Sequence, residues 1–344
     1  IGALAMDPTN ESVLYAGTGE ANFANHSRYG LGLLKSIDGG DHWQVLARPT
    51  FGGRCFSRIV IDPNNPQVLY AAITRAGGFP TLAAAKGHPQ ARGTTGVFKS
   101  LDGGVTWAQL AGGLPGVDAT DLAIDPVNPS VLYAAIGHIF GSPANGIYKS
   151  VDAGGTWVRL LGGLPGAPGR ISIGIAPSDR NRLYALVCQP ADGTGGGATT
   201  IDAYRSDNAG GTWAALGVGS MQATYGWYLS VVTVHPTDPA IAFFGGLILR
   251  RYNNGGIASV SPPHPDMHAL AWDAMGRLVC GNDGGVHRSA NLGASWQPRN
   301  NGLATIQFYA GLSTHPTDDT ITVSYTHLRA HETKANLVCR LLLE

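Results

Sequence analysis

A two-part repeat along most of the 344-residue chain restricts its fold more than any other feature. The first part is an apolar run that ends in Asp-Pro or a variant, followed by a polar turn and a second apolar run. Its copies begin at Leu4, Ile59, Leu122, Ile173, Val232, Leu270 and Leu312. Repetition at this spacing indicates a fold in which one supersecondary unit is used many times.

The second part of the repeat predicts a tight turn. It reads Ser, any residue, Asp or Asn, then four residues that include Gly, and then Trp, as in VFKSLDGGVTW from Val97. Ser and Asp oxygens accept hydrogen bonds from nearby backbone N–H groups, and Gly adopts the positive φ that such turns need. We therefore predict a structural role for ten residues: Asp38, Trp43, Asp102, Trp107, Asp152, Trp157, Asn208, Trp213, Asn291 and Trp296.

Each repeat unit contains about four short apolar runs with a two-residue period, which is typical of a propeller blade. The composition agrees, because 44% hydrophobic residues combined with 49 Gly and 21 Pro favours short strands joined by turns. The sequence predicts an all-β fold, a β-propeller over residues 1–323 with six blades and the first strand of a truncated seventh. Residues 324–344 carry no repeat, and we expect them to be a non-native tail.

Charge and cysteine content exclude several functional classes. The 23 basic and 23 acidic residues give no net charge, whereas nucleic-acid binding normally requires a basic surplus. No apolar run is long enough to span a bilayer. The four cysteines have no metal-binding spacing, and no Asp-rich run matches a calcium loop. We expect no metal, no cofactor, no nucleic-acid partner and no membrane span.

The Ser-x-Asp-x-Gly-x-Thr-Trp pattern resembles the Asp-box (BNR) repeat of sialidases, sortilin/VPS10-like ectodomains and family 74 glycoside hydrolases. This resemblance implies a propeller whose repeated Asp residues lie away from the functional face. It also implies a secreted, periplasmic or cell-surface location. The sialidase pattern itself is not met, because the chain has no Arg-Ile-Pro segment.

Function is expected where the repeat departs from its consensus. Residues 17–32 form a long loop that carries Glu20, Asn22, Arg28 and Tyr29. Further insertions at residues 77–93 and 192–198 occupy the same place in their blades, between the second and third strands. All three loops should therefore project from one face.

A further departure lies in residues 262–273, and the stretch 281–289 follows it. His264, Asp266 and His268 alternate along a segment that we expect to be extended, so their side chains should share one side. Such a pattern can bind a metal, or Asp266 can orient His268 by hydrogen bonding. Asp283 follows in the Gly-flanked turn NDGG.

Two functions remain open from these residues. In the first, the propeller binds a polysaccharide or protein ligand through Asn22, Arg28, Tyr29, His264 and His268. In the second, the chain is a fragment of a family 74-like glycoside hydrolase, in which Glu20 pairs with Asp266 or Asp283 as catalytic carboxylates. An assembly factor that docks protein partners is a third reading.

Overall fold

The computed structural model describes residues 1–24, 27–77, 94–194, 196–303, 312–314 and 321–323. The chain divides into two units, Ile1–Arg299 and Asn300–Glu344. The first unit contains six antiparallel sheets of four strands, each built from strands consecutive in the sequence. This arrangement confirms the predicted all-β propeller fold.

The strands of each blade follow the four apolar runs of its repeat unit. Blades one and two contain β1 (Ala3–Asp7), β2 (Asn10–Gly17), β3 (Leu33–Ser36), β4 (Gln44–Leu46), β5 (Arg54–Ile61), β6 (Leu69–Arg75), β7 (Gly96–Ser100) and β8 (Ala108–Gln109). Blades three and four contain β9 (Ala119–Ile124), β10 (Leu132–Ile136), β11 (Gly146–Ser150), β12 (Val158–Leu160), β13 (Ile171–Ala176), β14 (Asp179–Cys188), β15 (Thr200–Ser206) and β16 (Ala214–Ala215). Blades five and six contain β17 (Val231–Val234), β18 (Ile241–Gly245), β19 (Leu249–Asn253), β20 (Gly256–Ser259), β21 (Ala269–Trp272), β22 (Leu278–Asn282), β23 (Gly285–Ser289) and β24 (Gln297–Pro298).

The prediction of a truncated seventh blade was wrong. The described residues contain six four-stranded blades. Beyond them, β25 (Leu312–Thr314) pairs with β26 (Ile321–Val323) in a two-stranded sheet that belongs to the second unit. The run at Leu312 resembles the start of a repeat unit, but no Ser-x-Asp line follows it to supply a third and fourth strand. The tail at residues 324–344 lies outside the described residues.

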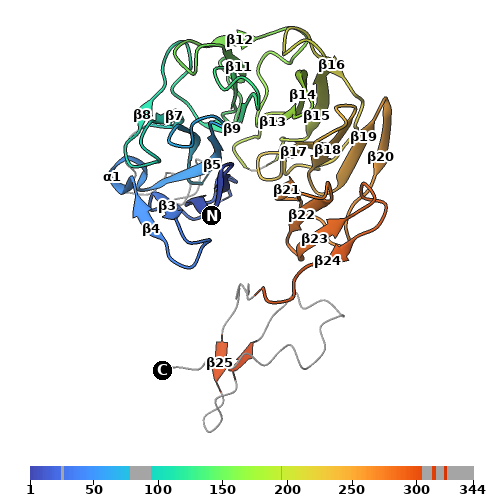
Figure 1. The fold of residues 1–344 in the computed structure, drawn as a ribbon. Coiled ribbons are helices and arrows are strands. Elements are labelled where there is room, and N and C mark those ends of the chain that lie inside the picture. The colour runs from blue at the N-terminus through green and yellow to red at the C-terminus, as the bar shows by residue number, and fades with distance from the viewer. Residues whose placement is uncertain (25–26, 78–93, 195, 304–311, 315–320, 324–344) are drawn as a thin grey trace. The chain divides into compact units, whose positions relative to one another are not determined.

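Figure 1 shows the six blades following one another in chain order around a common centre. The first strand of each blade is the innermost, because β1 contacts β5, β5 contacts β9, and the series continues through β13 and β17 to β21. Blades pack face to face through apolar clusters. Tyr15 and Leu33 of blade one, for example, pack with Ile59 and Leu69 of blade two.

A cation in the third strand links each of the first three blades to the next one. The Nζ atoms of Lys35, Lys99 and Lys149 donate to the carbonyl oxygens of Gly103, Ala153 and Ala209, at 3.2, 3.0 and 3.0 Å. Each lysine also lies over a tyrosine ring of its own blade. The acceptor is always the residue after the Asp or Asn of the turn, so these links tie one blade to the turn of the following blade.

The Ser-x-Asp turns are held by one repeated network. In blade three, Ser150 Oγ donates to Asp152 Oδ1 at 2.7 Å and accepts from the backbone N–H of Gly154 at 2.9 Å. Asp152 in turn accepts from the backbone and the hydroxyl of Thr156. Trp157 Nε1 donates to the Gly154 carbonyl at 3.1 Å. Ser150 is the buried centre of this network.

The Ser150→Ala variant is expected to lose about 1–3 kcal/mol of the free energy of unfolding, because the Gly154 N–H becomes a buried donor without its acceptor. The measurement is urea denaturation followed by tryptophan fluorescence. Ser178→Ala is the matched control, since Ser178 is exposed and its loss should cost less than about 0.5 kcal/mol. Equal denaturation midpoints for the two variants would contradict this account of the turn.

Candidate functional site

The loops between second and third strands come together at one end of the blades. Phe23 from the long loop of blade one packs with Ile139 of blade three, Ala191 and Ala198 of blade four, and Trp227 at the entry to blade five. This contact agrees with the prediction that the insertions share one face, here called the loop face. Of the predicted insertions, residues 78–93 lie outside the described residues.

Arg170 is a buried cation beneath the loop face. Its Nη1 atom donates to the carbonyl oxygens of Trp227 and Tyr228, both at 3.0 Å, and its guanidinium lies 5.9 Å from the centre of the Phe23 ring. Burial lowers the pKa of Arg170, while the charge of Asp121 acts in the opposite direction. Arg170 therefore connects the blade-one loop to the turn that leads into blade five.

Asp121 is a buried carboxylate in the first strand of blade three. Its oxygens accept from the backbone N–H groups of Leu122 and Ile173 at 2.9 and 3.0 Å, and Arg58 Nε lies 3.6 Å away. Burial raises the pKa of Asp121, and Arg58 and the two backbone donors oppose that rise. These contacts give the Asp121 carboxylate a structural role where blades two, three and four pack together.

His268, Asp283 and Tyr228 form a partly exposed group on the loop face. His268 Nε2 lies 2.8 Å from Asp283 Oδ1, with 27% and 52% of the respective side chains exposed. The Tyr228 ring meets the imidazole edge to face, with a centroid distance of 5.2 Å and an interplanar angle of 86°. The group offers an aromatic surface beside a carboxylate–imidazole pair, which is a combination suited to a ligand with both hydroxyl groups and apolar faces.

The alternation expected for His264, Asp266 and His268 is not present. The segment before β21 is not a strand, and Asp266 has a φ of 67°, which turns the backbone out of the extended conformation. Met267 is buried between Asp266 and His268. As a result, Asp283 is the hydrogen-bonding partner recorded for His268, in the place that the sequence suggested for Asp266. His264 lies over Gly284 instead.

The other predicted site residues lie in the blade-one loop, residues 17–32. The Glu20 N–H donates to the Arg28 carbonyl at 2.8 Å, which closes the loop at its base. Glu20 is half-buried beside Cys55, whose pKa is raised to about 12 mainly by burial, with a further contribution from the Glu20 charge. Arg28 and Tyr29 are exposed and Asn22 is half-buried. Glu20 therefore lies against the first strand of blade two, whereas Asp283 belongs to blade six.

The turn residues lie at the opposite end of the third strands from the loop face. Hydrogen bonds from Thr106 and Thr156 lower the pKa of Asp102 and of Asp152 to about 2. The pKa of Asp38 is lowered further, chiefly by the backbone N–H of His42. A carboxyl held ionised in this way cannot serve as a general acid near neutral pH. Asn208 and Asn291 accept from the same turn positions.

Trp227 and Tyr228, together with Arg170, were missed by the sequence interpretation. Trp227 and Tyr228 lie in the long connection between blades four and five, and Arg170 lies directly before β13, the first strand of blade four. Neither place belongs to a repeat consensus from which a residue could depart. The only available signal was the Trp-Tyr pair itself in residues 225–228, directly before an innermost strand.

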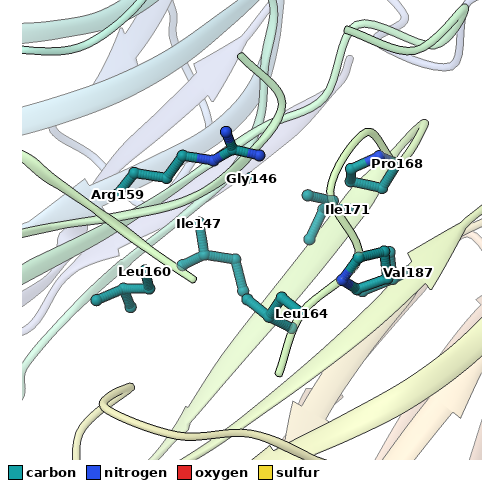
Figure 2. Close-up of a pocket in the computed structure, with 9 residues that line it drawn as sticks. Gly146, Ile147, Arg159, Leu160, Leu164, Pro168, Ile171 and Val187 are labelled. Atoms are coloured by element: carbon teal, nitrogen blue, oxygen red, sulfur yellow. The ribbon is translucent and has the colours of Figure 1, made fainter. Parts of the chain in front are cut away.

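A small pocket between blades three and four is not a ligand site. Figure 2 shows it lined by Ile147, Leu160, Leu164, Ile171 and Val187, with the Arg159 side chain nearby. The space inside is ≈ 10 Å³, about that of one water molecule. A sugar ring does not fit there.

Two further observations concern only the described part of the chain. It contains no group of three or more His, Cys, Asp or Glu side chains placed to hold a metal ion. No helix within it has the length and apolar character needed to cross a bilayer.

Comparison with curated proteins gives one weak relative. A xyloglucanase from Paenibacillus sp is 28% identical over 116 residues, which are 32% of this chain and 9% of that protein. No family model matches the chain.

Solved structures give clearer likenesses. The GH74 enzyme of Niastella koreensis aligns with a TM-score of 0.50 and 19% identity, over 94% of this chain and 53% of that one. An ancestral GH74 enzyme aligns with a TM-score of 0.59 and 17% identity, over 86% and 40% of the two chains. YCF48 bound to D1 peptide gives a TM-score of 0.52 and 15% identity, over 93% and 87%. The chain spans about half the length of these two GH74 enzymes, and it shares their β-propeller fold.

Proposed function

We propose that this chain is an exported Asp-box β-propeller that binds a polysaccharide on its loop face. The observation that carries the proposal is the group of His268, Asp283 and Tyr228, in which an oriented imidazole–carboxylate pair lies beside an aromatic ring. Exposed Arg28, Tyr29 and Tyr225 belong to loops at the same end of the blades. The glycan class comes from the likeness to GH74 enzymes, and the exported location from the Asp-box resemblance.

The Asp283→Asn variant is expected to bind polysaccharide at least about tenfold more weakly, because a charge-assisted hydrogen bond is lost and His268 is no longer oriented. The measurement is affinity electrophoresis or calorimetry with xyloglucan, β-glucan and pectin. Asp41→Asn is the matched control, since Asp41 is exposed in a turn at the opposite end of blade one. If both variants bind as the unmodified protein does, or if the unmodified protein binds none of these polymers, the proposal fails.

The alternative function is a glycoside hydrolase that uses Glu20, Asp266 and Asp283 as carboxylates. The similarity of 116 residues to a xyloglucanase favours it. Retaining enzymes need two carboxyl groups about 5–5.5 Å apart, and inverting enzymes need a separation of about 6.5–9.5 Å. Reducing ends released from xyloglucan, and their loss in Glu20→Gln, Asp266→Asn or Asp283→Asn with binding retained, would support this reading. Bound but uncleaved polymer supports the binding module.

A protein ligand is the remaining reading of the loop face. Its support is the likeness to YCF48, which was solved bound to a D1 peptide. Competition distinguishes the two ligand classes, because a polysaccharide bound at Asp283 should displace any peptide bound at the same group.

A further inference from the structure

One face of blade one is apolar and exposed, although the same face of every following blade is covered. Leu4 and Met6 are 73% and 57% exposed. The pairings of Leu4 with Ala16 and of Met6 with Leu14 place these residues on one side of the sheet, together with Leu34. We call this side, formed by Leu4, Met6, Leu14 and Leu34, the front face of blade one.

The repeat shows what normally covers such a face. The residues at the position of Leu4 in blades two to five, Ile59, Leu122, Ile173 and Val232, are all buried, and Leu270 of blade six packs on blade five. In each case the cover is the opposite side of the preceding blade. The tryptophans of the Ser-x-Asp turns show the same difference between blade one and later blades. Trp43 of blade one is 40% exposed, whereas Trp157 and Trp213 of blades three and four are buried. The front face of blade one is therefore complementary to a blade of this same kind.

The turn of blade one also lacks the lysine contact that the turn of blade two receives. Lys35 reaches the carbonyl of Gly103, the residue that corresponds to Gly39. A Cβ added at Gly103 would lie 2.9 Å from that lysine nitrogen, whereas a Cβ at Gly39 would meet nothing within 4 Å. Within the described residues, no cation is recorded on the Gly39 carbonyl.

The matching surface exists on blade six. Ala269 and Ala271 are exposed, and the register places Val279 and Arg288 on their side of the sheet, away from the residues that pack on blade five. Arg288 occupies the sequence position of Lys35, Lys99 and Lys149, which carry the inter-blade links. We call this side, formed by Ala269, Ala271, Val279 and Arg288, the back face of blade six.

We propose that the back face of blade six in one copy of the chain docks on the front face of blade one in a second copy. Both faces are exposed within the unit Ile1–Arg299, so this unit does not cover either face itself. The contact reproduces the packing between successive blades, with Arg288 directed at the turn carbonyl of Gly39. Such an interface is head-to-tail, because the two surfaces that meet are different. The proposal is independent of the loop-face function.

The test is molar mass by light scattering on the full chain at micromolar concentration. Unmodified protein is expected to give at least twice the mass of one chain, and both Leu4→Lys and Ala271→Arg should reduce it to one chain. Leu101→Lys is the matched control and should leave the mass unchanged, since Leu101 is exposed at a turn position where Ile37 and Val151 are exposed as well. Circular dichroism confirms that each variant remains folded.

Mixing the two single-face variants gives the decisive result. Leu4→Lys retains a normal back face and Ala271→Arg a normal front face, so an equimolar mixture should form dimers although each variant alone is monomeric. A monomeric unmodified protein, or a mixture that remains monomeric, overturns the proposal. Dissociation by Leu4→Lys without dissociation by Ala271→Arg also overturns it, because the front face would then bind something other than blade six.

Discussion

The Arg170→Met variant is expected to lose about 3–5 kcal/mol of the free energy of unfolding, because removal of a buried cation leaves its partners uncompensated. Two carbonyl oxygens, those of Trp227 and Tyr228, lose their donor, and the buried Asp121 loses a nearby positive charge. Methionine retains most of the apolar stem, so the loss reports the polar contacts rather than the volume. The measurement is the urea midpoint and slope.

The same variant has an expected consequence at the loop face. Tyr228 contacts His268, so release of the Tyr228 backbone should weaken polysaccharide binding even though Arg170 itself is buried. Arg180→Met is the matched control, since Arg180 is exposed and its loss should cost less than about 0.5 kcal/mol. An Arg170→Met protein as stable as the control would show that the Trp227 and Tyr228 carbonyls do not depend on the guanidinium.

The Phe51→Ala variant is expected to lose about 3–5 kcal/mol of the free energy of unfolding, because it opens a cavity in a closely packed aromatic cluster. Phe51 ends the short helix α1 (Arg48–Phe51) that leads from blade one into blade two. Its ring is fully buried and meets Phe56, Phe98 and Trp107 edge to face, with centroid distances of 4.9, 5.1 and 5.5 Å. The loss should appear as a lower midpoint in thermal and urea unfolding.

Phe51→Leu separates the effect of the cavity from the loss of aromatic contacts. Its loss of unfolding free energy should be clearly smaller than that of Phe51→Ala, because leucine keeps more of the side-chain volume. Val105→Ala is the exposed control and should have little effect. If Phe51→Ala unfolds at the same urea concentration as Val105→Ala, the helix α1 is not part of the cooperative core between the first two blades.

The blades could be predicted because their determinants are local. Ser150, Asp152, Gly154 and Trp157 lie within eight consecutive residues, and their hydrogen bonds close inside that segment. Each copy therefore carries its own turn chemistry, and repetition makes the pattern visible. The seventh blade was predicted in error from a single apolar run at Leu312, since one strand without a turn line does not specify a blade.

The site could be predicted only in part, because its contacts connect residues distant in sequence. Asp283 and His268 were both selected, but their pairing depends on the positive φ of Asp266, which no repeat consensus encodes. Arg170 and Tyr228 were not selected at all. Their bond spans 58 residues and two blades, and it arises from tertiary packing rather than from a local pattern.

The links from Lys35, Lys99 and Lys149 also bear on how such a chain can evolve. Each lysine and the turn that it stabilises belong to different copies of the repeat. Blades two and three each give a cation to the next turn and receive one from the preceding blade, so a duplicated segment of this kind would carry both halves of the connection. A point substitution at one of these lysines therefore acts on the turn of the neighbouring copy, so its effect on stability is shared between two copies of the repeat.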